Sequence, residues 1–167
     1  MRVLIISLPR TGSHSLMNQY SNKHKLDTYG EPFNKNYKLP SDWMTSDNVI
    51  VKTMLTQYPN GVVNGINYWY EQSKSFDEVI LLSRKDLYDC AKSFSYLIDN
   101  IDFGFDANIP YVWKETPSLE SVYKELQSQH KKLESISNKL NIPIKYYEDI
   151  FDVNSKNRLR KKNKEII

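Results

Sequence analysis

The residues best suited to chemistry lie near the N-terminus, between an apolar run at residues 3–6 and apolar residues at helical spacing from Leu16. This pattern predicts a strand, a tight turn and a helix. The connecting stretch consists of Pro9, Arg10, Thr11, Gly12, Ser13, His14 and Ser15. The first backbone N–H groups of a helix have no intrahelical partner and lie at the positive end of the helix dipole, so they attract anions. Arg10 adds a fixed charge suited to phosphate or sulfate oxygens, and the hydroxyls add donors, so the stretch predicts a phosphate cradle.

Two common nucleotide-binding loops do not fit this stretch. The ATP- and GTP-binding loop Gly-x-x-x-x-Gly-Lys-Ser/Thr has a lysine after its second glycine, whereas Ser13 and His14 follow Gly12. The dinucleotide fingerprint needs three spaced glycines, and Gly12 is the single glycine of the stretch. On these residues alone, an ordinary strand-to-helix turn with polar caps stays open as the alternative.

The order Pro-Arg-Thr-Gly-Ser at residues 9–13 resembles the 5′-phosphosulfate loop of the sulfotransferases that use 3′-phosphoadenosine 5′-phosphosulfate. The family pattern is roughly Pro-Arg/Lys-Ser/Thr-Gly-Ser/Thr-Thr, and His14 departs where a threonine is usual. The resemblance implies that residues 9–15 bind the 5′-phosphosulfate of the cofactor.

A second segment follows the apolar run at residues 79–82. Arg84 at the strand end, and Ser93 two helical turns further on, resemble the 3′-phosphate motif of the family, most closely in bacterial trehalose-type enzymes. The resemblance implies that two guanidinium N–H groups and a hydroxyl hold the 3′-phosphate. The alternative is a surface ion pair of Arg84 with Asp86 or Asp89, which contributes little.

Two shorter segments also match in the family's order. Residues 30–33, Gly-Glu-Pro-Phe, resemble the Gly-Glu-Pro segment of carbohydrate sulfotransferases, which implies that Glu31 takes the proton of the acceptor. Residues 147–150, Tyr-Glu-Asp-Ile, resemble a Tyr-Glu-Asp-Leu segment whose role looks structural. The resemblance therefore extends from residue 3 to about residue 150.

The chain also departs from the family. Residues 49–54 resemble the Lys-Thr-His segment, but Met54 replaces the histidine that serves as base in cytosolic enzymes, which shifts that role to Glu31. Lys52 lies either near the sulfate or at a strand end as an ordinary charge. The late Arg-Lys-Gly loop that covers the nucleotide has no counterpart, and the basic run at 158–162 is either its substitute or a solvated tail.

The resemblance implies transfer of a sulfuryl group from 3′-phosphoadenosine 5′-phosphosulfate to a hydroxyl or amine of a small-molecule or carbohydrate acceptor, leaving adenosine 3′,5′-bisphosphate. Like phosphoryl transfer, this reaction needs positioning and charge stabilisation and no metal. Arg10 would neutralise the leaving 5′-phosphate, Glu31 would be the general base, and His14 would contact phosphate, act as acid or base, or cap the helix. Two alternatives stay open, a nucleotide-binding relic without catalysis and a small nucleotide or metabolite kinase.

The apolar patterning predicts alternating strands and helices. The expected strands are those at 3–6, 49–52, 79–82 and 142–147. The expected helices run from 16 to about 24, over 60–73, over 87–98 and, after an N-cap at Thr116, to 140. Continuous apolar runs are typical of parallel strands covered on both faces. We therefore expect a three-layer, P-loop-like α/β fold with a parallel sheet of about four or five strands, in one domain over 1–153 with a basic polar tail at 154–167.

Composition further limits the classes of protein to which this chain can belong. A formal net charge of +3 gives no case for nucleic-acid binding by bulk electrostatics. Cys90 is the only cysteine and falls at an apolar helix position, so we expect a buried structural thiol and no intrachain disulfide. No apolar run approaches the ~20 residues that cross a bilayer, so a soluble cytoplasmic protein is expected. A homodimer would complete an open cofactor site, and the aromatic loop at 103–113 either contacts the acceptor or belongs to the core.

Overall fold

A five-stranded parallel sheet forms the centre of the protein, in a computed structural model that describes residues 1–33, 41–99 and 117–151. Its strands are β1 (Arg2–Ser7), β2 (Asp27–Gly30), β3 (Val49–Met54), β4 (Glu78–Ser83) and β5 (Ile144–Tyr146). They lie in the order β2-β3-β1-β4-β5, and every neighbouring pair is parallel. Their carboxyl ends therefore meet at one edge, where ligands of such sheets bind.

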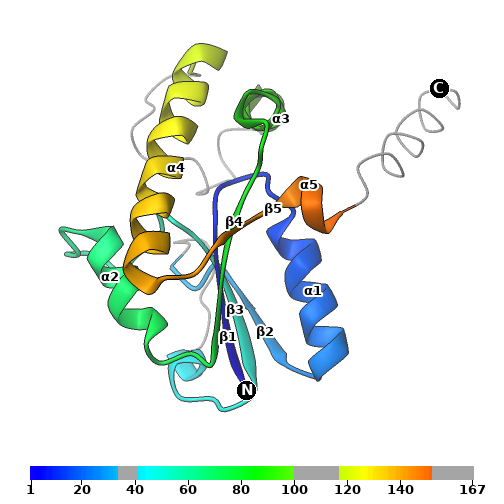
Figure 1. Ribbon diagram of the computed structural model, residues 1–167, viewed down its shortest axis with the longest axis vertical. Coiled ribbons are helices and arrows are strands. Elements are labelled where there is room, and N and C mark those ends of the chain that lie inside the picture. The colour runs from blue at the N-terminus through cyan, green and yellow to red at the C-terminus, as the bar shows by residue number, and fades with distance from the viewer. Residues whose placement is uncertain (34–40, 100–116, 152–167) are drawn as a thin grey trace, which may run out of the picture.

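Helices cover both faces of the sheet. They are α1 (Ser13–His24), α2 (Gly65–Ser73), α3 (Leu87–Asp99), α4 (Leu119–Leu140) and α5 (Tyr147–Ile150), with a short 3₁₀ helix, η1 (Ser41–Met44). Helices α2 and α4 lie on one side of the sheet and α1 and α5 on the other, while α3 lies beyond the end of β4 and packs on α4 (Figure 1). This arrangement confirms the expected three-layer α/β fold, and the β1–loop–α1 unit has the P-loop-like form.

The apolar strands supply two cores, one on each face. Leu4, Ile6 and Leu81 pack against α2 and α4, and Val3, Ile5 and Ile80 pack against α1. Because successive side chains of a strand point to opposite faces, a strand covered on both sides must be apolar throughout. This explains the continuous runs in the sequence, which the structure places as predicted in β1, β3 and β4.

The patterning predicted neither the short helix α5, which begins at Tyr147 where the last predicted strand was expected to end, nor the strand β2. Its sequence, Asp-Thr-Tyr-Gly, contains no apolar run, and its residues are exposed or half-buried. It lies at the edge of the sheet and pairs with β3 alone. An edge strand packs against fewer neighbours, so hydrophobic patterning carries little signal for it.

Two helix starts differ from the expectation. The N-cap of α4 is Ser118, whose hydroxyl accepts from the Ser121 N–H at 3.2 Å, so the predicted N-cap at Thr116 was wrong. Helix α2 begins at Gly65 after an Asn64 cap, later than predicted, because the Asn64 side chain accepts from the Asn67 N–H at 3.1 Å. The predicted tail at 154–167 and the aromatic loop at 103–113 lie outside the described residues.

Candidate functional site

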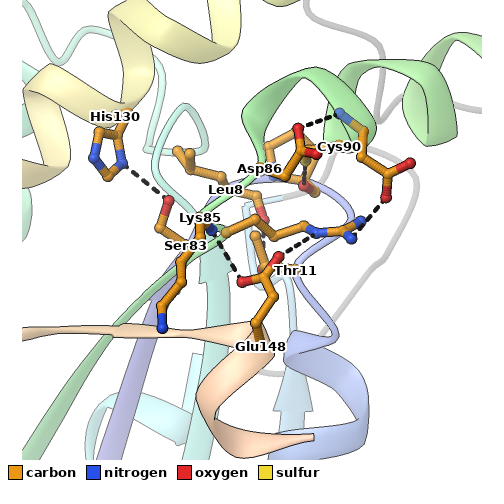
Figure 2. Close-up of polar contacts among 11 residues, drawn as sticks. Leu8, Thr11, Ser83, Lys85, Asp86, Cys90, His130 and Glu148 are labelled. Carbon is orange, nitrogen blue, oxygen red and sulfur yellow. Dashed lines mark hydrogen bonds and ion pairs between the residues drawn. The ribbon is translucent and has the colours of Figure 1, made fainter. Parts of the chain in front are cut away.

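The loop between β1 and α1 is held in a tight double turn. Arg10 and Gly12 both have left-handed backbone conformations, with φ of 59° and 70°. The Thr11 hydroxyl donates to the Leu8 carbonyl at 2.8 Å inside the loop, and the Cys90 thiol donates to the Pro9 carbonyl at 3.1 Å (Figure 2). Thr11 and Pro9 are buried, so they brace the loop, and the Thr11 hydroxyl donates inward rather than toward a ligand.

Helix α1 begins without a side-chain cap. Its first internal bond in the loop region runs from the Leu16 N–H to the Gly12 carbonyl at 3.0 Å, and Gly12 offers no side chain to the helix start. The N–H groups of Ser13, His14 and Ser15 therefore have no acceptor among the described residues. Unpaired N–H groups at a helix start can bind an anion, and here the 12 residues of α1 give that start a full helix dipole.

Gly12 is required for a second reason. A Cβ at this position would lie 2.7 Å from the Tyr147 ring, which belongs to α5. The loop is therefore packed directly against α5, on the face that also carries α1.

Arg10 and Ser93 meet across the sheet edge. The exposed Arg10 side chain donates from Nε to the Ser93 hydroxyl of α3 at 3.2 Å. Burial raises the pKa of the Cys90 thiol to about 12, while the charges of Arg84 and Arg10 both act on it in the opposite direction. The Arg10 guanidinium bonds to Ser93 and the Arg84 guanidinium bonds to Asp89 of the same helix, so both side chains contact α3.

Arg84 is held by two carboxylates. Its Nε donates to Glu148 at 3.2 Å and its NH2 group donates to Asp89 at 2.8 Å. The predicted alternative, an ion pair with Asp89, is thus present, whereas the Asp86 carboxylate accepts from the Asp89 N–H at 2.8 Å instead (Figure 2). The Ser93 hydroxyl, which was expected to bind the same phosphate as Arg84, accepts a hydrogen bond from Arg10.

Glu31 forms a buried ion pair. It follows β2 with a left-handed backbone at φ 57°, and its side chain bonds to Lys52 of β3 and accepts from the Gln57 amide at 3.0 Å. Glu31 is 3% exposed and Lys52 is 1% exposed. Burial lowers the pKa of Lys52, and the facing carboxylate offsets part of that shift. The pair lies at the carboxyl edge because Gly30 and Lys52 are partners in the β2–β3 ladder.

His14 lies between the loop and this ion pair. The residue is exposed at the start of α1, yet its Nε2 lies 3.5 Å from the position of a Cβ built on Gly30. Partial burial lowers the His14 pKa, Lys52 lowers it further, and Glu31 opposes both. At neutral pH the ring is therefore uncharged and can donate or accept one hydrogen bond.

The strand order places these groups in a row. Glu31 and Lys52 lie at the ends of β2 and β3, the loop with Arg10 follows β1, and Arg84 follows β4. A buried ion pair thus stands at one end of the row and two arginines at the other. Within the described ranges, no group of three or more His, Cys, Asp or Glu side chains is placed to hold a metal ion, and no helix is long and apolar enough to cross a membrane.

Several contacts of the site escaped the sequence reasoning. Gln57 and Lys52 were not predicted as partners of Glu31, because that pairing depends on β2, which has no hydrophobic signal. Glu148 was expected to be structural, yet it contacts Arg84. Its position directly after the last strand was the one available signal.

Comparisons with known proteins give little detail. No family model matches the chain, and no curated protein sequence is similar to it. Among solved structures, the chain is similar to the YorR protein of Bacillus subtilis, crystallised in complex with phosphorylated GDP, at 8% identity and a TM-score of 0.48. The similarity covers 87% of this chain and 84% of that chain. A similarity this distant says nothing about the reaction.

Proposed function

We propose that the protein is a sulfotransferase that moves a sulfuryl group from 3′-phosphoadenosine 5′-phosphosulfate to a hydroxyl or amine of a small-molecule or carbohydrate acceptor. The observation that carries the proposal is the position of Arg10 and Arg84, which come from the β1 and β4 loops and both contact α3, at Ser93 and at Asp89. Two cations on one side of an amide-lined loop match a nucleotide with phosphates at both 5′ and 3′ positions.

The chain's own groups suit each part of this reaction. The free N–H groups at the start of α1 would hold the 5′-phosphate oxygens, and Arg10 would neutralise the charge that grows on them as the sulfur–oxygen bond breaks. Glu31 would accept the proton of the acceptor hydroxyl, and Lys52 beside it would stabilise the negative charge near the sulfuryl group. The cofactor supplies the activated sulfuryl group, and the protein supplies position and charge.

The substitution Arg10→Ala tests the proposal. Because Arg10 is exposed, its removal should leave the fold intact and lower the rate of labelled sulfate transfer by about 10²–10³-fold. Arg2→Ala would be a poor control, since Arg2 holds several backbone carbonyls, so Lys92→Ala is preferred: Lys92 is an exposed cation of α3 whose partner is the Tyr88 ring. Full transfer activity in Arg10→Ala would contradict the role assigned to this residue.

A second candidate is a nucleotide-binding protein without transferase activity. The observation in its favour is the enclosure of Glu31, whose two oxygens are occupied by Lys52 and Gln57. The two candidates differ in one assay: both bind adenosine 3′,5′-bisphosphate, which raises the melting temperature, but only the enzyme transfers labelled sulfate. Stabilisation by ATP with none by the bisphosphate would favour a kinase instead.

A further inference from the structure

The carboxylate of Glu148 occupies a position that is built for an anion. Its Oε1 accepts from Arg84 Nε at 3.2 Å, and its Oε2 accepts from the Lys85 backbone N–H at 2.9 Å (Figure 2). A guanidinium and a backbone amide that together hold two oxygens are the same donors that bind a phosphate group. Figure 2 shows Glu148 reaching from α5 toward the turn that follows β4.

The surroundings strengthen this contact. The side chain of Arg84 is 13% exposed and that of Glu148 is 21% exposed, so water screens the pair only in part. Burial alone would lower the pKa of Arg84, but the hydrogen bond to Glu148, together with nearby negative charge that includes Asp89, raises it overall. A phosphate that binds Arg84 along its Nε edge must therefore displace Glu148.

We propose that Glu148 competes with the 3′-phosphate for Arg84 and Lys85, and so weakens the binding of a nucleotide that carries this phosphate relative to one that does not. This inference rests on the proposed function. A phosphomonoester carries a charge of about −1.5 to −2 at pH 7, more than one carboxylate, so it can replace Glu148. A nucleotide with a free 3′-hydroxyl lacks that charge and leaves Glu148 on Arg84.

The neighbouring residue provides a matched control. Asp149 stands next to Glu148 in α5 and also forms an ion pair, with the side chain of Lys85. The side chains of Asp149 and Lys85 are 55% and 56% exposed, so their pair is screened and worth little. Replacement of either acidic residue by its amide removes one negative charge from the same short helix.

The test is calorimetric titration of the full chain with adenosine 3′,5′-bisphosphate and with 5′-AMP. In Glu148→Gln, the affinity for the bisphosphate should rise about tenfold, because the competing charge is gone, while the affinity for 5′-AMP stays within about twofold. In Asp149→Asn, both affinities should stay within about twofold of the wild type.

Results that contradict the role of Glu148 can be distinguished from results that contradict the proposed function. Wild-type binding of the bisphosphate, with equal affinity in Glu148→Gln and Asp149→Asn, overturns the competitor role and leaves the proposed function standing. Absence of bisphosphate binding in all three proteins overturns both. An equal gain for 5′-AMP and the bisphosphate shows that Glu148 does not compete with the 3′-phosphate, and overturns the proposal.

A measurement on the wild type keeps the test valid if Glu148→Gln does not fold. The Nε–H resonance of Arg84, assigned by its loss in Arg84→Lys, should shift on addition of the bisphosphate and stay in place with 5′-AMP. A resonance that both nucleotides leave unchanged, although the bisphosphate binds, overturns the proposal.

Discussion

The charged side chains at the two ends of the sheet's carboxyl edge differ in burial and in pairing. At the β2–β3 end, Glu31 and Lys52 are removed from water and neutralise each other. At the β1–β4 end, Arg10 is exposed and the first amides of α1 have no partner among the described residues. One end keeps its charges balanced without a ligand. At the other end Glu148 and Asp89 balance Arg84, but no carboxylate of the described residues pairs with Arg10.

Under the proposed function, this difference suits one end of the edge to anion binding and the other to proton transfer. An anion is attracted over a distance by exposed positive charge, whereas proton transfer depends on groups whose environment is dry. His14 lies between the two ends and is influenced by both Lys52 and Glu31. Substitutions at each end should therefore affect different quantities.

The largest effect is expected from breaking the buried pair. Lys52→Met leaves the Glu31 carboxylate buried without its cation, which should lower the free energy of unfolding by about 3–5 kcal/mol. Urea denaturation measures this loss. The control is Lys74→Met, which removes an exposed ion pair with Glu71 and should change stability by less than about 0.5 kcal/mol.

The double variant Glu31→Gln with Lys52→Met sharpens the result. With neither charge present, much of the lost stability should return. Equal stability of Lys52→Met and Lys74→Met would show that the β2–β3 end is hydrated like the surface.

A smaller effect is expected from the loop end. Gly12→Ala forces a side chain into a left-handed backbone and against Tyr147 at 2.7 Å, whereas Gly61→Ala meets the same kind of backbone, at φ 89°, with no atom within 4 Å. Both should lose about 1–2 kcal/mol from backbone strain, and Gly12→Ala should lose further stability through the contact with Tyr147. Thermal unfolding of both variants measures the difference. Equal losses of stability would mean that the Tyr147 ring of α5 moves aside at no cost.

The smallest effect on stability is expected from His14, which lies between the two ends. Because its pKa is lowered in the folded protein, the unfolded chain binds the proton more readily, so the contribution of His14 to stability is lost as the pH falls below about 6.5. Sulfate, which does not titrate in this range, should recover part of that loss by binding the protonated ring.

Melting temperatures with and without sulfate, between pH 7.5 and 5, measure this effect. The gain from sulfate should grow toward low pH in the wild type and stay flat in His14→Asn. Parallel curves for the two proteins would separate His14 from the anion site.

The sequence predicted the parts of this site that depend on chain-local features. The β1–loop–α1 unit follows from an apolar run, a glycine and a helical period, all within one short segment. Arg84 was placed correctly at the end of β4 for the same reason. Local patterns determine which residues reach the edge, because a parallel sheet brings every strand end to it.

Contacts between segments distant in the sequence could not be predicted in the same way. The bond between Arg10 and Ser93 depends on how α3 packs, and the bond between Arg84 and Glu148 depends on where β5 joins the sheet. Charged side chains choose among several partners within reach, and that choice is made by tertiary geometry rather than by spacing. The sequence thus identified the cations of the site, and the structure identified their partners.

Cys90 has a consequence beyond its packing. The chain has no other cysteine, and this sulfur is enclosed beneath the phosphate loop as an undissociated thiol. A thiol in that form reacts only when the loop and α3 separate, so its rate of alkylation counts the moments at which the site opens. Under the proposed function, a bound nucleotide should therefore slow the alkylation of Cys90.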